Sequence, residues 1–575
     1  MINADLARAF ERIADLMEIT GGDRFRVNSY RRVSRTIGDL TDDIADIAAR
    51  GKLTDLPGVG KGTADRIAQF LETGTIDVLD DLESRLPVGL PELLSIPGMG
   101  PKKVAAVHEK LGVGGTDDLK RVIESGELAN LPGFGETSVK RIADGIAFLE
   151  TSGGRTALGI AQPLAEAQAE RVAGIRGVKR VAVAGSLRRG AETIGDVDLL
   201  CEASNGREVV EAFVNAAVVK RVLASGDTKG SVTVESPDRR ELQIDLRVVP
   251  AESYGAALQY FTGSKEHNVR LRELAVNRKW RLNEYGLFDG ETRLAGATEE
   301  EIYARLGLPC FPPELREDRG EFEDPGCVDD LLDLSDIRGD LHVHTIASDG
   351  MATIEEMAKA AKALGYKYIA ICDHSKSSAI ANGLSTERME RHIEDIRAVE
   401  RKLKGIAVLV GCEVDILSDG SLDYPDDILR ECDLVTASIH FGMQGAKTSP
   451  TRRTLAAMEN PYVNIIGHPT GRLLGQRPPM DVDMAAIVKG AAESGTALEI
   501  NAAWARLDLK DIHVRQAIDA GAMLAVCTDA HSTGGLATIG YGVTTARRGR
   551  AAKRHVLNAR PLGRVRQWLA GKRDR

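Results

Sequence analysis

Histidines and carboxylates recur at the ends of apolar, strand-like runs between residue 340 and the C-terminus of this 575-residue chain. The motifs are DLHVHTIASDG (340–350), CDHS (372–375), GCEVD (411–415), SIH (438–440), GHP (467–469) and TDAH (528–531). Imidazole nitrogens mixed with carboxylate oxygens suit Zn, Mn or Fe better than Mg or Ca. The chain must therefore fold so that the ends of distant strands meet at a metal centre.

In the same region, seven strand-like runs alternate with helical patterns such as those at 353–365 and 483–495. The runs cover 340–345, 367–373, 406–414, 434–440, 463–467, 497–501 and 523–528. Such repetition predicts parallel βα units, and seven units predict a (βα)7-like barrel, one unit short of the eightfold form. Barrel enzymes place their sites at the C-terminal ends of the strands, where these His, Asp and Glu residues lie.

The whole chain is too long for a single hydrophobic core, so we expect about three or four domains. No apolar run approaches the roughly 20 residues that would span a bilayer, which predicts no membrane partner. The seven cysteines form no C-x-x-C pair and show no regular spacing, which argues against a disulfide framework or a zinc ribbon. We therefore expect a protein of the reducing cytoplasm.

Charge is distributed unevenly around a formal net value of −10. The stretch 313–338 is strongly acidic, whereas 547–575 and 265–281 are basic. The mean charge therefore hides local basic patches, and such patches attract phosphate backbones. The acidic, Pro-containing stretch that ends near 338 is the best candidate for a linker, and it suggests a separable C-terminal module.

A Pro-Gly-x-Gly motif occurs three times in the first 150 residues, at LPGVGKGTADRI (56–67), IPGMGPKKVAAV (96–107) and LPGFGETSVKRI (131–142). The glycines permit a tight turn with outward-facing N–H groups, and the following helix N-terminus adds positive potential. Three copies favour a sequence-independent phosphate grip over a plain helix connection. The motifs resemble helix-hairpin-helix motifs, which bind DNA backbones. The expected DNA contacts are Gly58, Gly60, Gly98, Gly100, Gly133 and Gly135.

From about residue 155 the pattern changes to strands at 178–185, 197–203, 232–236 and 242–249, with a helix around 207–218. Asp196 and Asp198 lie two residues apart on a strand, so both carboxylates point to one face. Asp245 lies in a second strand that could lie alongside. Three convergent carboxylates can hold two divalent cations for in-line displacement on a phosphate.

Gly185 and Ser186 follow a strand and open a turn, ten residues before the Asp-x-Asp pair. A backbone N–H and the Ser186 hydroxyl could receive phosphate oxygens there, and Arg189 would supply positive charge. An isolated Asp-x-Asp is weak evidence for a two-cation site. The turn that precedes it and the strand aspartate that follows it make the evidence strong.

The segments GSLRRGAETIGDVDLL (185–200), IDLRVVP (244–250) and YFTGSKEHNVRLRELA (260–275) resemble the palm and thumb of family X DNA polymerases, the polymerase-beta type. The resemblance implies that Asp196, Asp198 and Asp245 hold two Mg²⁺ or Mn²⁺ ions. It implies nucleotide contacts from Gly185, Ser186, Arg189, Gly195, Tyr260, Phe261, Gly263 and Asn268. Asn268 would face the minor-groove edge of the base, and Arg272 would lie near the template strand.

Two positions depart from that family. Ile194 stands where a small polar residue is common, so one phosphate contact should be missing. Arg66 stands where vertebrate relatives place a Schiff-base lysine for removing 5′-deoxyribose phosphate. Because a guanidinium stays protonated, we expect no such lyase activity at this site, although Lys61 is nearby.

Residues 339–547 resemble the PHP (polymerase and histidinol phosphatase) domain, with its motifs in the expected order. The resemblance implies phosphoester hydrolysis at a cluster of about three Zn, Mn or Fe ions. Its implied ligands are His342, His344, Glu413 and Asp529 on one ion, Glu413, His440 and His468 on a second, and Asp349, His374 and His531 on a third. Asp415 and Asn501 would support the ligands, and Cys372 and Cys527 read as core residues.

The expected fold is multidomain, with α, α+β and α/β parts. We expect helical DNA-binding regions at 1–80 and 81–150, a nucleotidyltransferase palm at 151–255, a thumb at 256–315, an acidic linker at 316–338, and a PHP domain with a basic C-terminal tail at 339–575.

The expected function is filling of short gaps in base-excision or end repair by a DNA polymerase with a 3′–5′ exonuclease, 3′-phosphatase or AP endonuclease centre. Gapped or 3′-recessed DNA and dNTPs would be its partners, and we expect a monomer in the cytoplasm, at the nucleoid. Three alternatives remain: a nucleotidyltransferase of RNA or a small molecule, a DNA-binding scaffold with a vestigial PHP module, and a small-molecule phosphatase. The helix-hairpin-helix motifs and intact carboxylates argue against the first two, and the last ignores more than half of the chain.

Overall fold

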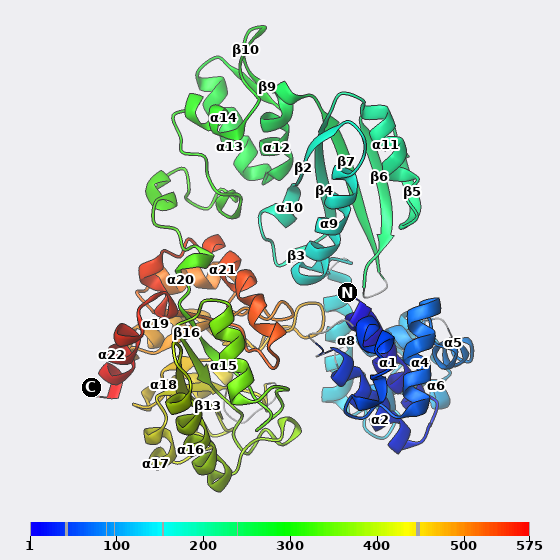
Figure 1. Cartoon of the computed structure of the whole chain (residues 1–575), viewed down its shortest axis with the longest axis vertical. Coiled ribbons are helices and arrows are strands. Elements are labelled where there is room, and N and C mark those ends of the chain that lie inside the picture. Colours follow the sequence, from blue (N-terminus) through cyan, green and yellow to red (C-terminus); the bar gives the residue numbers. More distant parts are fainter. Residues whose placement is uncertain are drawn as a thin grey trace. The chain divides into compact units, whose positions relative to one another are not determined.

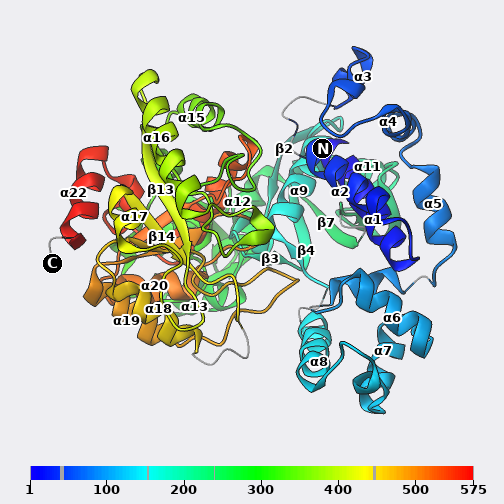
Figure 2. The same cartoon turned by 90° about the horizontal axis from the view of Figure 1, so that it is seen from below.

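The computed structural model describes residues 2–38, 40, 44–87, 89–96, 98–151, 154–237, 240–443 and 449–573. The chain divides into two compact units, one of Met1–Gly154 with Gly475–Pro478 and one of Arg155–Leu474 with Pro479–Arg575. Figures 1 and 2 show the elements of each unit. No helix within the described ranges has both the length and the apolar character that crossing a membrane requires.

The first unit is helical. Its helices are α1 (Ile2–Ile19), α2 (Arg24–Gly38), α3 (Ile44–Ala49), α4 (Lys61–Thr73), α5 (Asp77–Ser84), α6 (Pro101–Leu111), α7 (Thr116–Glu124) and α8 (Glu136–Thr151). Leu6, Phe10 and Ile13 recur at helical spacing along α1 and are fully buried. Phe10 stacks on Tyr30 of α2 with ring centroids 5.9 Å apart, so α1 and α2 form a pair.

The Gly-x-Gly residues of the three motifs form the same turn before α4, α6 and α8. In each turn the middle residue is buried (Val59, Met99 and Phe134), and its N–H donates to the carbonyl three residues earlier. The glycines on either side are exposed. The first glycine of each pair has a positive φ, between 81° and 91°, which an L side chain rarely adopts. The three turns therefore present matching, exposed glycines to solvent.

A five-stranded sheet begins the second unit. Its elements are β1 (Thr156–Ala157), α9 (Leu158–Ala173), β2 (Val178–Val183), α10 (Gly185–Arg188), β3 (Thr193–Ile194), β4 (Asp196–Ala203), α11 (Gly206–Val214), β5 (Val219–Ser225), β6 (Lys229–Glu235) and β7 (Glu241–Val249). The strand order is β2-β4-β7-β6-β5, and only β4 and β7 run parallel. Edge strand β5 was not predicted, because its side chains are mostly exposed and carry no alternating apolar pattern.

The two faces of this sheet differ in chemistry. Alternate residues of β4 and β7, such as Val197, Leu199 and Ile244, join α9 and α11 in one hydrophobic core. Because side chains alternate along a strand, Asp196, Asp198 and Asp245 project from the opposite face.

A smaller three-stranded antiparallel sheet follows, with order β10-β9-β8. Its elements are α12 (Tyr254–Thr262), α13 (Lys265–Asn277), β8 (Arg281–Asn283), β9 (Gly286–Asp289), β10 (Thr292–Ala295) and α14 (Glu299–Arg305). His267 of α13 is fully buried here, and its ring nitrogens lie 2.8 Å from Tyr303 Oη and 2.8 Å from Glu321 Oε1.

The rest of the second unit is a seven-stranded parallel barrel, as the βα pattern predicted. Its strands are β11 (Gly339–Val343), β12 (Tyr368–Ile371), β13 (Ala407–Asp415), β14 (Leu434–Ser438), β15 (Ile465–Ile466), β16 (Ala497–Asn501) and β17 (Leu524–Cys527), hydrogen-bonded in chain order. The first and last strands meet where the His344 N–H donates to Ala530 O and the Asp529 N–H donates to His342 O. Figure 2 shows helices around β13 and β14.

Helices cover this barrel and close one end of it. They are α15 (Ile354–Ala363), α16 (Thr386–Lys402), α17 (Asp426–Glu431), α18 (Pro450–Glu459), α19 (Met484–Ser494), α20 (Asp511–Asp519), α21 (Ile539–Arg548) and α22 (Leu562–Arg573). Val565 and Leu569 of α22 pack against the inner apolar residues, which include Cys372 and Cys527. Both cysteines are thus core residues, as predicted, and all seven cysteines of the chain are free thiols.

The acidic segment, residues 313–338, is packed rather than free. Arg316 is 1% exposed and pairs with the buried Glu299 of α14. Glu321 is also 1% exposed, and it accepts hydrogen bonds from the N–H groups of Asp318 and Arg319 in addition to its contact with His267. These buried contacts attach the first part of the segment to α13 and α14.

The basic C-terminal run was expected to form a patch for phosphates, and its first half does not do so. Five of its cations pair with the acidic segment. The pairs are Glu314–Arg547, Glu317–Arg548, Asp324–Arg550, Asp330–Arg554 and Asp336–Lys553. The two charged stretches neutralise each other because they lie side by side, although more than 200 residues separate them in sequence.

Replacing Glu321 by alanine should loosen the acidic segment locally. The change leaves His267 and two backbone N–H groups without their buried partner, which costs about 2–4 kcal/mol. Hydrogen–deuterium exchange should show faster exchange at Asp318 and Arg319. Glu323→Ala is the matched control, because Glu323 is 62% exposed and its pair with Arg270 lies at the surface. Equal exchange in the two variants would contradict the anchoring role of Glu321.

Candidate active sites

The first candidate centre lies on the open face of the five-stranded sheet, and we call it the sheet centre. Parallel strands β4 and β7 place Asp198 directly opposite Asp245, and Asp196 lies two residues earlier on the same face. The structure thus brings together the three carboxylates that the sequence nominated. Asp245 is oriented by Ser231 Oγ, which donates to Oδ1 at 2.5 Å, and by Gln243 Nε2 at 2.9 Å.

The electrostatics of the sheet centre suit added cations. Burial raises the pKa of Asp198 to about 7, and the negative charges of Asp196 and Asp245 act in the same direction. Lys229 offsets part of this repulsion, with its Nζ 3.5 Å from Asp245 Oδ2. A half-buried carboxyl group with so high a pKa has too little positive charge around it, and oxygen-ligated divalent ions would supply that charge.

The turn from β2 into α10 lies against Asp198. The Ala184 N–H donates to Asp198 O at 2.8 Å, and Gly185 has φ +64°. A β-carbon at Gly185 would lie 2.3 Å from Asp198 Oδ2, so only glycine fits there. The turn therefore brings Ser186 and Arg189 to the same side of the sheet as the carboxylates.

The remaining predicted nucleotide and template contacts surround α12 and α13. Tyr260 and Phe261 pack edge to face with centroids 5.2 Å apart, and Gly263 ends α12 with φ +69°. The side-chain amide of Asn268 donates to Tyr260 O at 2.8 Å and also accepts from Gln259, so it ties α13 to α12.

Gly195 and Arg272 are exposed, and Ile194 is fully buried. Arg66 of the first unit donates to Gly62 O at 2.6 Å.

The second candidate centre lies at the C-terminal ends of the barrel strands, and we call it the barrel centre. Alternation that continues past the strand ends carries an inward-facing apolar layer into a ligand layer, as in Cys372 to His374 just after β12 and Cys527 to Asp529 at the end of β17. All nine predicted ligands lie in this layer. They are His342, His344, Asp349, His374, Glu413, His440, His468, Asp529 and His531.

Distances within the barrel centre match those of ligands that share ions. His342 Nε2 and His344 Nε2 are 3.2 Å apart, and His440 Nε2 and His468 Nε2 are 3.3 Å apart. Two nitrogens bound to one tetrahedral zinc ion, each at about 2.0–2.1 Å, lie about 3.3 Å apart. Among the described residues, the buried ligand atoms His344 Nδ1 and His468 Nδ1 have no hydrogen-bond partner, and His374 Nδ1 and Glu413 Oε2 lie 2.9 Å from each other. The donor set therefore fits bound metal.

Three groups of side chains could each hold an ion. The groups are His344, Asp349, His374 and His531; His342, His344 and Asp529; and His374, Glu413 and His440. They resemble the predicted division, but His344 and His374 each belong to two groups. His468 belongs to none of them, although its Nε2 lies 3.0 Å from Glu413 Oε1.

Buried carboxylates behind the ligands set the imidazole orientations. His440 Nδ1 lies 2.6 Å from Asp415 Oδ1, and Asn501 Nδ2 donates to Asp529 Oδ2 at 3.0 Å. Sequence reasoning had nominated Asp415 and Asn501 for this supporting role. It missed Glu499, whose oxygens contact His342 Nδ1 at 2.7 Å and the His468 N–H at 2.6 Å. The sequence feature that could have identified Glu499 is a carboxylate inside the apolar strand β16, two residues before Asn501.

Nearby carboxylates raise the pKa values of two ligand histidines, so these imidazoles carry protons when no metal ion is bound. Burial opposes a charge on His440, but Glu413 and Asp415 raise its pKa to about 10. Burial likewise opposes a charge on His531, but Asp349 and Asp529 raise its pKa to about 9. Burial and two neighbouring imidazoles instead lower the pKa of His344 to about 4. Ion binding must therefore displace protons from His440 and His531, which links metal affinity to pH.

Comparisons with known proteins cover both centres. Family profiles match at 1–76 (helix-hairpin-helix domain), 90–147 (SAM-like helix-hairpin-helix tandem), 257–317 (DNA polymerase beta thumb) and 340–501 (PHP domain). The chain is 38% identical over 571 residues to the DNA polymerase/3'-5' exonuclease PolX of Bacillus subtilis (strain 168), covering 99% of each chain.

Proteins described as probable phosphatases match smaller shares of the chain. The one from Acetivibrio thermocellus is 35% identical over 166 residues, which are 28% of this chain and 64% of the phosphatase. The one from Thermoanaerobacter sp. (strain X514) is 28% identical over 245 residues, which are 41% of this chain and 95% of that protein. Similarity to the polymerase thus extends over the whole chain, whereas each phosphatase matches less than half of it.

Magnesium binding at the sheet centre should depend on the ionisation of Asp198. Its pKa is raised, so below pH 7 a proton must leave before an ion binds, and affinity should fall about tenfold per pH unit. Above about pH 8 the affinity should be nearly constant. Titration calorimetry of the wild type, with the Asp196→Ala/Asp198→Ala variant as the background to subtract, would measure this site. A constant affinity between pH 6 and pH 7 would rule out the raised pKa.

Metal content should depend on the barrel histidines. The His342→Ala/His344→Ala variant should lose about half or more of the transition metal that copurifies with the wild type, because it removes two nitrogen ligands. Elemental analysis by mass spectrometry would measure this without an activity assay. His513→Ala/His555→Ala, two histidines outside the ligand layer, is the matched control and should keep wild-type content. Equal losses in the two variants would point to general unfolding instead.

Proposed function

The chain belongs to the bacterial family X DNA polymerases that carry a C-terminal PHP domain, and we propose that it is a DNA-directed DNA polymerase with a metal-dependent 3′-end-processing centre. It would fill short gaps in base-excision or end repair. The barrel would remove or unblock 3′ ends as a 3′–5′ exonuclease, with 3′-phosphatase or AP endonuclease activity. The domain boundaries expected from the sequence form part of this proposal.

The observation that carries the polymerase half is the register of β4 against β7, which pairs Asp198 with Asp245 beside Asp196. These three carboxylates would hold two Mg²⁺ or Mn²⁺ ions, and bound ions would supply the positive charge that in-line transfer to a primer 3′-hydroxyl needs. Asp198, once ionised, completes the ligand set, and Ser231 and Gln243 keep Asp245 oriented.

Substrate contacts would come from the turn and helices around these carboxylates. Gly185, Ser186 and Gly195 offer backbone N–H groups and a hydroxyl to phosphate oxygens, and Arg189 adds positive charge. Tyr260, Phe261 and Gly263 would flank the sugar of the incoming nucleotide. Asn268 would face its base, and Arg272, exposed on α13, would lie near the template strand.

The barrel centre would carry the hydrolytic step, and its nine ligands would hold about three Zn²⁺, Mn²⁺ or Fe ions. Bound there, such ions would supply Lewis acidity and positive charge for a phosphate diester. Glu413, fully enclosed by imidazoles, would bridge two ions, because both of its oxygens face histidines. Glu499 and Asp415 hold the Nδ1 sides of His342 and His440, so their Nε2 atoms keep lone pairs for metal. An intact ligand set favours catalysis over a vestigial scaffold.

The three hairpin turns of the first unit would grip the DNA backbone through the exposed N–H groups around Gly58, Gly60, Gly98, Gly100, Gly133 and Gly135. Gapped or 3′-recessed DNA and dNTPs are the proposed substrates of a monomer working at the nucleoid, in the cytoplasm. The turns weigh against a nucleotidyltransferase for small molecules, which has no use for three phosphate-backbone grips.

Two double variants should separate the two activities. On gapped, 3′-recessed DNA with dNTPs and Mn²⁺, Asp196→Ala/Asp198→Ala should extend primers more than about a hundredfold more slowly and still degrade 3′ ends. His342→Ala/His344→Ala should lose degradation and keep extension. Gel electrophoresis of end-labelled primers measures both reactions at once. If either variant lost both activities while remaining folded, the proposal of two independent centres would fail.

A further inference from the structure

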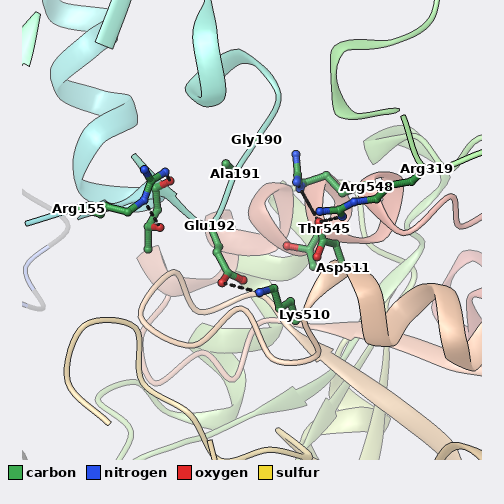
Figure 3. Close-up of a pocket in the computed structure, with 10 residues that line it drawn as sticks. Arg155, Gly190, Ala191, Glu192, Arg319, Lys510, Asp511, Thr545 and Arg548 are labelled. Carbon is green, nitrogen blue, oxygen red and sulfur yellow. Dashed lines mark hydrogen bonds and ion pairs between the residues drawn. The ribbon is translucent and has the colours of Figure 1, made fainter. Parts of the chain in front are cut away.

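Charged side chains gather where the loop after α10 of the five-stranded sheet meets the barrel. They line a pocket that includes Gly190, Arg319, Asp511 and Arg548. Figure 3 shows Arg319 and Arg548 converging on Asp511 at one side of this pocket, and Lys510 paired with Glu192 at the other. The loop after α10 and the barrel are therefore in direct contact through charged groups.

Glu317 of the acidic segment lies at the middle of this contact. One of its oxygens, Oε1, accepts from Arg189 Nε at 3.0 Å and from Arg548 Nη1 at 2.9 Å. Arg548 Nη1 also donates to the backbone carbonyl of Arg189 at 2.7 Å. Arg189, predicted to bind the triphosphate, is thus held by its side chain and its backbone at once.

The flanks of Glu317 leave it little freedom. Arg316 O accepts from the Ser264 N–H at 2.9 Å, and the Arg316 side chain is buried against Glu299. Glu321, four residues after Glu317, is anchored on His267. A carboxylate held on both sides in this way acts as a fixed acceptor rather than as a mobile surface charge.

Arg548 is fixed equally firmly. It is 9% exposed, and its Nε and Nη2 both contact Asp511 Oδ2, at 3.1 and 2.9 Å. The loop also approaches α21 so closely that a β-carbon at Gly190 would lie 2.1 Å from Thr544 Cγ2. Asp511 thus holds Arg548 from the barrel side, and Arg548 presents its remaining donors to Arg189 and Glu317.

Arg189 also reaches the thumb side of the nucleotide site. Its Nη1 donates to Thr262 O at 2.6 Å, at the end of α12 and next to Gly263. With Nε bonded to Glu317, the guanidinium plane is fixed and only its outer edge remains for a phosphate. Ile194 is fully buried and its side chain has no polar group for a phosphate, so phosphate binding depends more on Arg189.

We propose that Glu317 and Arg548 are positioning residues for nucleotide addition, so that the barrel holds the triphosphate-binding arginine of the sheet centre in place. The inference rests on the proposed polymerase function, because it concerns the binding of dNTP. It assigns part of the nucleotide site to α21, a helix of the hydrolytic barrel.

The Glu317→Gln variant tests whether Glu317 acts by orienting Arg189 or only through its negative charge. Removing a negative charge near the triphosphate would lower the KM for dNTP if charge alone mattered. A positioning role predicts the opposite, a KM raised about three- to tenfold with kcat changed less than about twofold, because a charge-assisted bond to Arg189 weakens. Arg548→Lys keeps the charge but cannot reach all of its acceptors, so it should raise KM too. Single-nucleotide insertion into gapped DNA measures both constants.

The neighbouring pair Glu314–Arg547 provides the matched control, because it joins the same segment to the same helix without touching Arg189. Glu314→Gln and Arg547→Gln should leave KM within about twofold of the wild type. All variants should keep wild-type hydrolysis of DNA 3′ ends, which shows that the barrel is folded. Double-mutant cycles should find Glu317→Gln and Arg548→Gln non-additive.

Two results would overturn the inference: a KM for dNTP that is unchanged or lowered in Glu317→Gln, or equal increases in the control variants. Both presuppose that the wild type inserts nucleotides. A wild type without insertion activity would instead refute the proposed polymerase function, and the inference with it.

Discussion

Side-chain alternation along β-strands is the constraint on which both centres depend. In the sheet it separates one apolar face, covered by α9 and α11, from a face that carries three carboxylates. In the barrel it aligns inward-facing residues in layers, so that an apolar layer continues directly into the ligand layer. A one-residue slip of β4 would place Asp196 and Asp198 in the apolar core, and the cost of burying them keeps the register fixed.

The two centres solve the same problem of concentrated charge in different ways. The sheet centre gathers like charges, and burial with mutual repulsion leaves Asp198 with a pKa of about 7. The barrel centre interleaves carboxylates with imidazoles. Burial alone would raise the pKa of Glu413, but His440, His374 and His342 hold it well below its ordinary value. Hard, oxygen-seeking ions suit the first arrangement, and ions that accept nitrogen suit the second. One chain can therefore support two metal chemistries without exchanging ligands between them.

Local patterns predicted most of the architecture, because they carry their own periodicity. The seven barrel strands, the hairpin turns and the acidic pair Asp196 and Asp198 are all visible within windows of about ten residues. Edge strand β5 was missed because an exposed strand has no apolar alternation to reveal it. Glu499 was missed for a different reason. A lone carboxylate in an apolar strand shows that a partner exists, but its contact with His342 spans 157 residues and no local pattern encodes it.

The two charged stretches show most clearly what cannot be predicted from local sequence. Ten acidic residues between 313 and 338 have the composition of a solvated linker when they are read alone, and the basic run after 547 has that of a phosphate-binding tail. In the structure, five acidic residues of the first stretch pair with five cations of the second. Arg316 and Glu321 are buried, although the composition of the segment predicts exposed charges. A charged side chain can be buried where an opposite charge and hydrogen bonds replace its hydration. Through these pairs the segment after the thumb becomes a structural part of both catalytic halves.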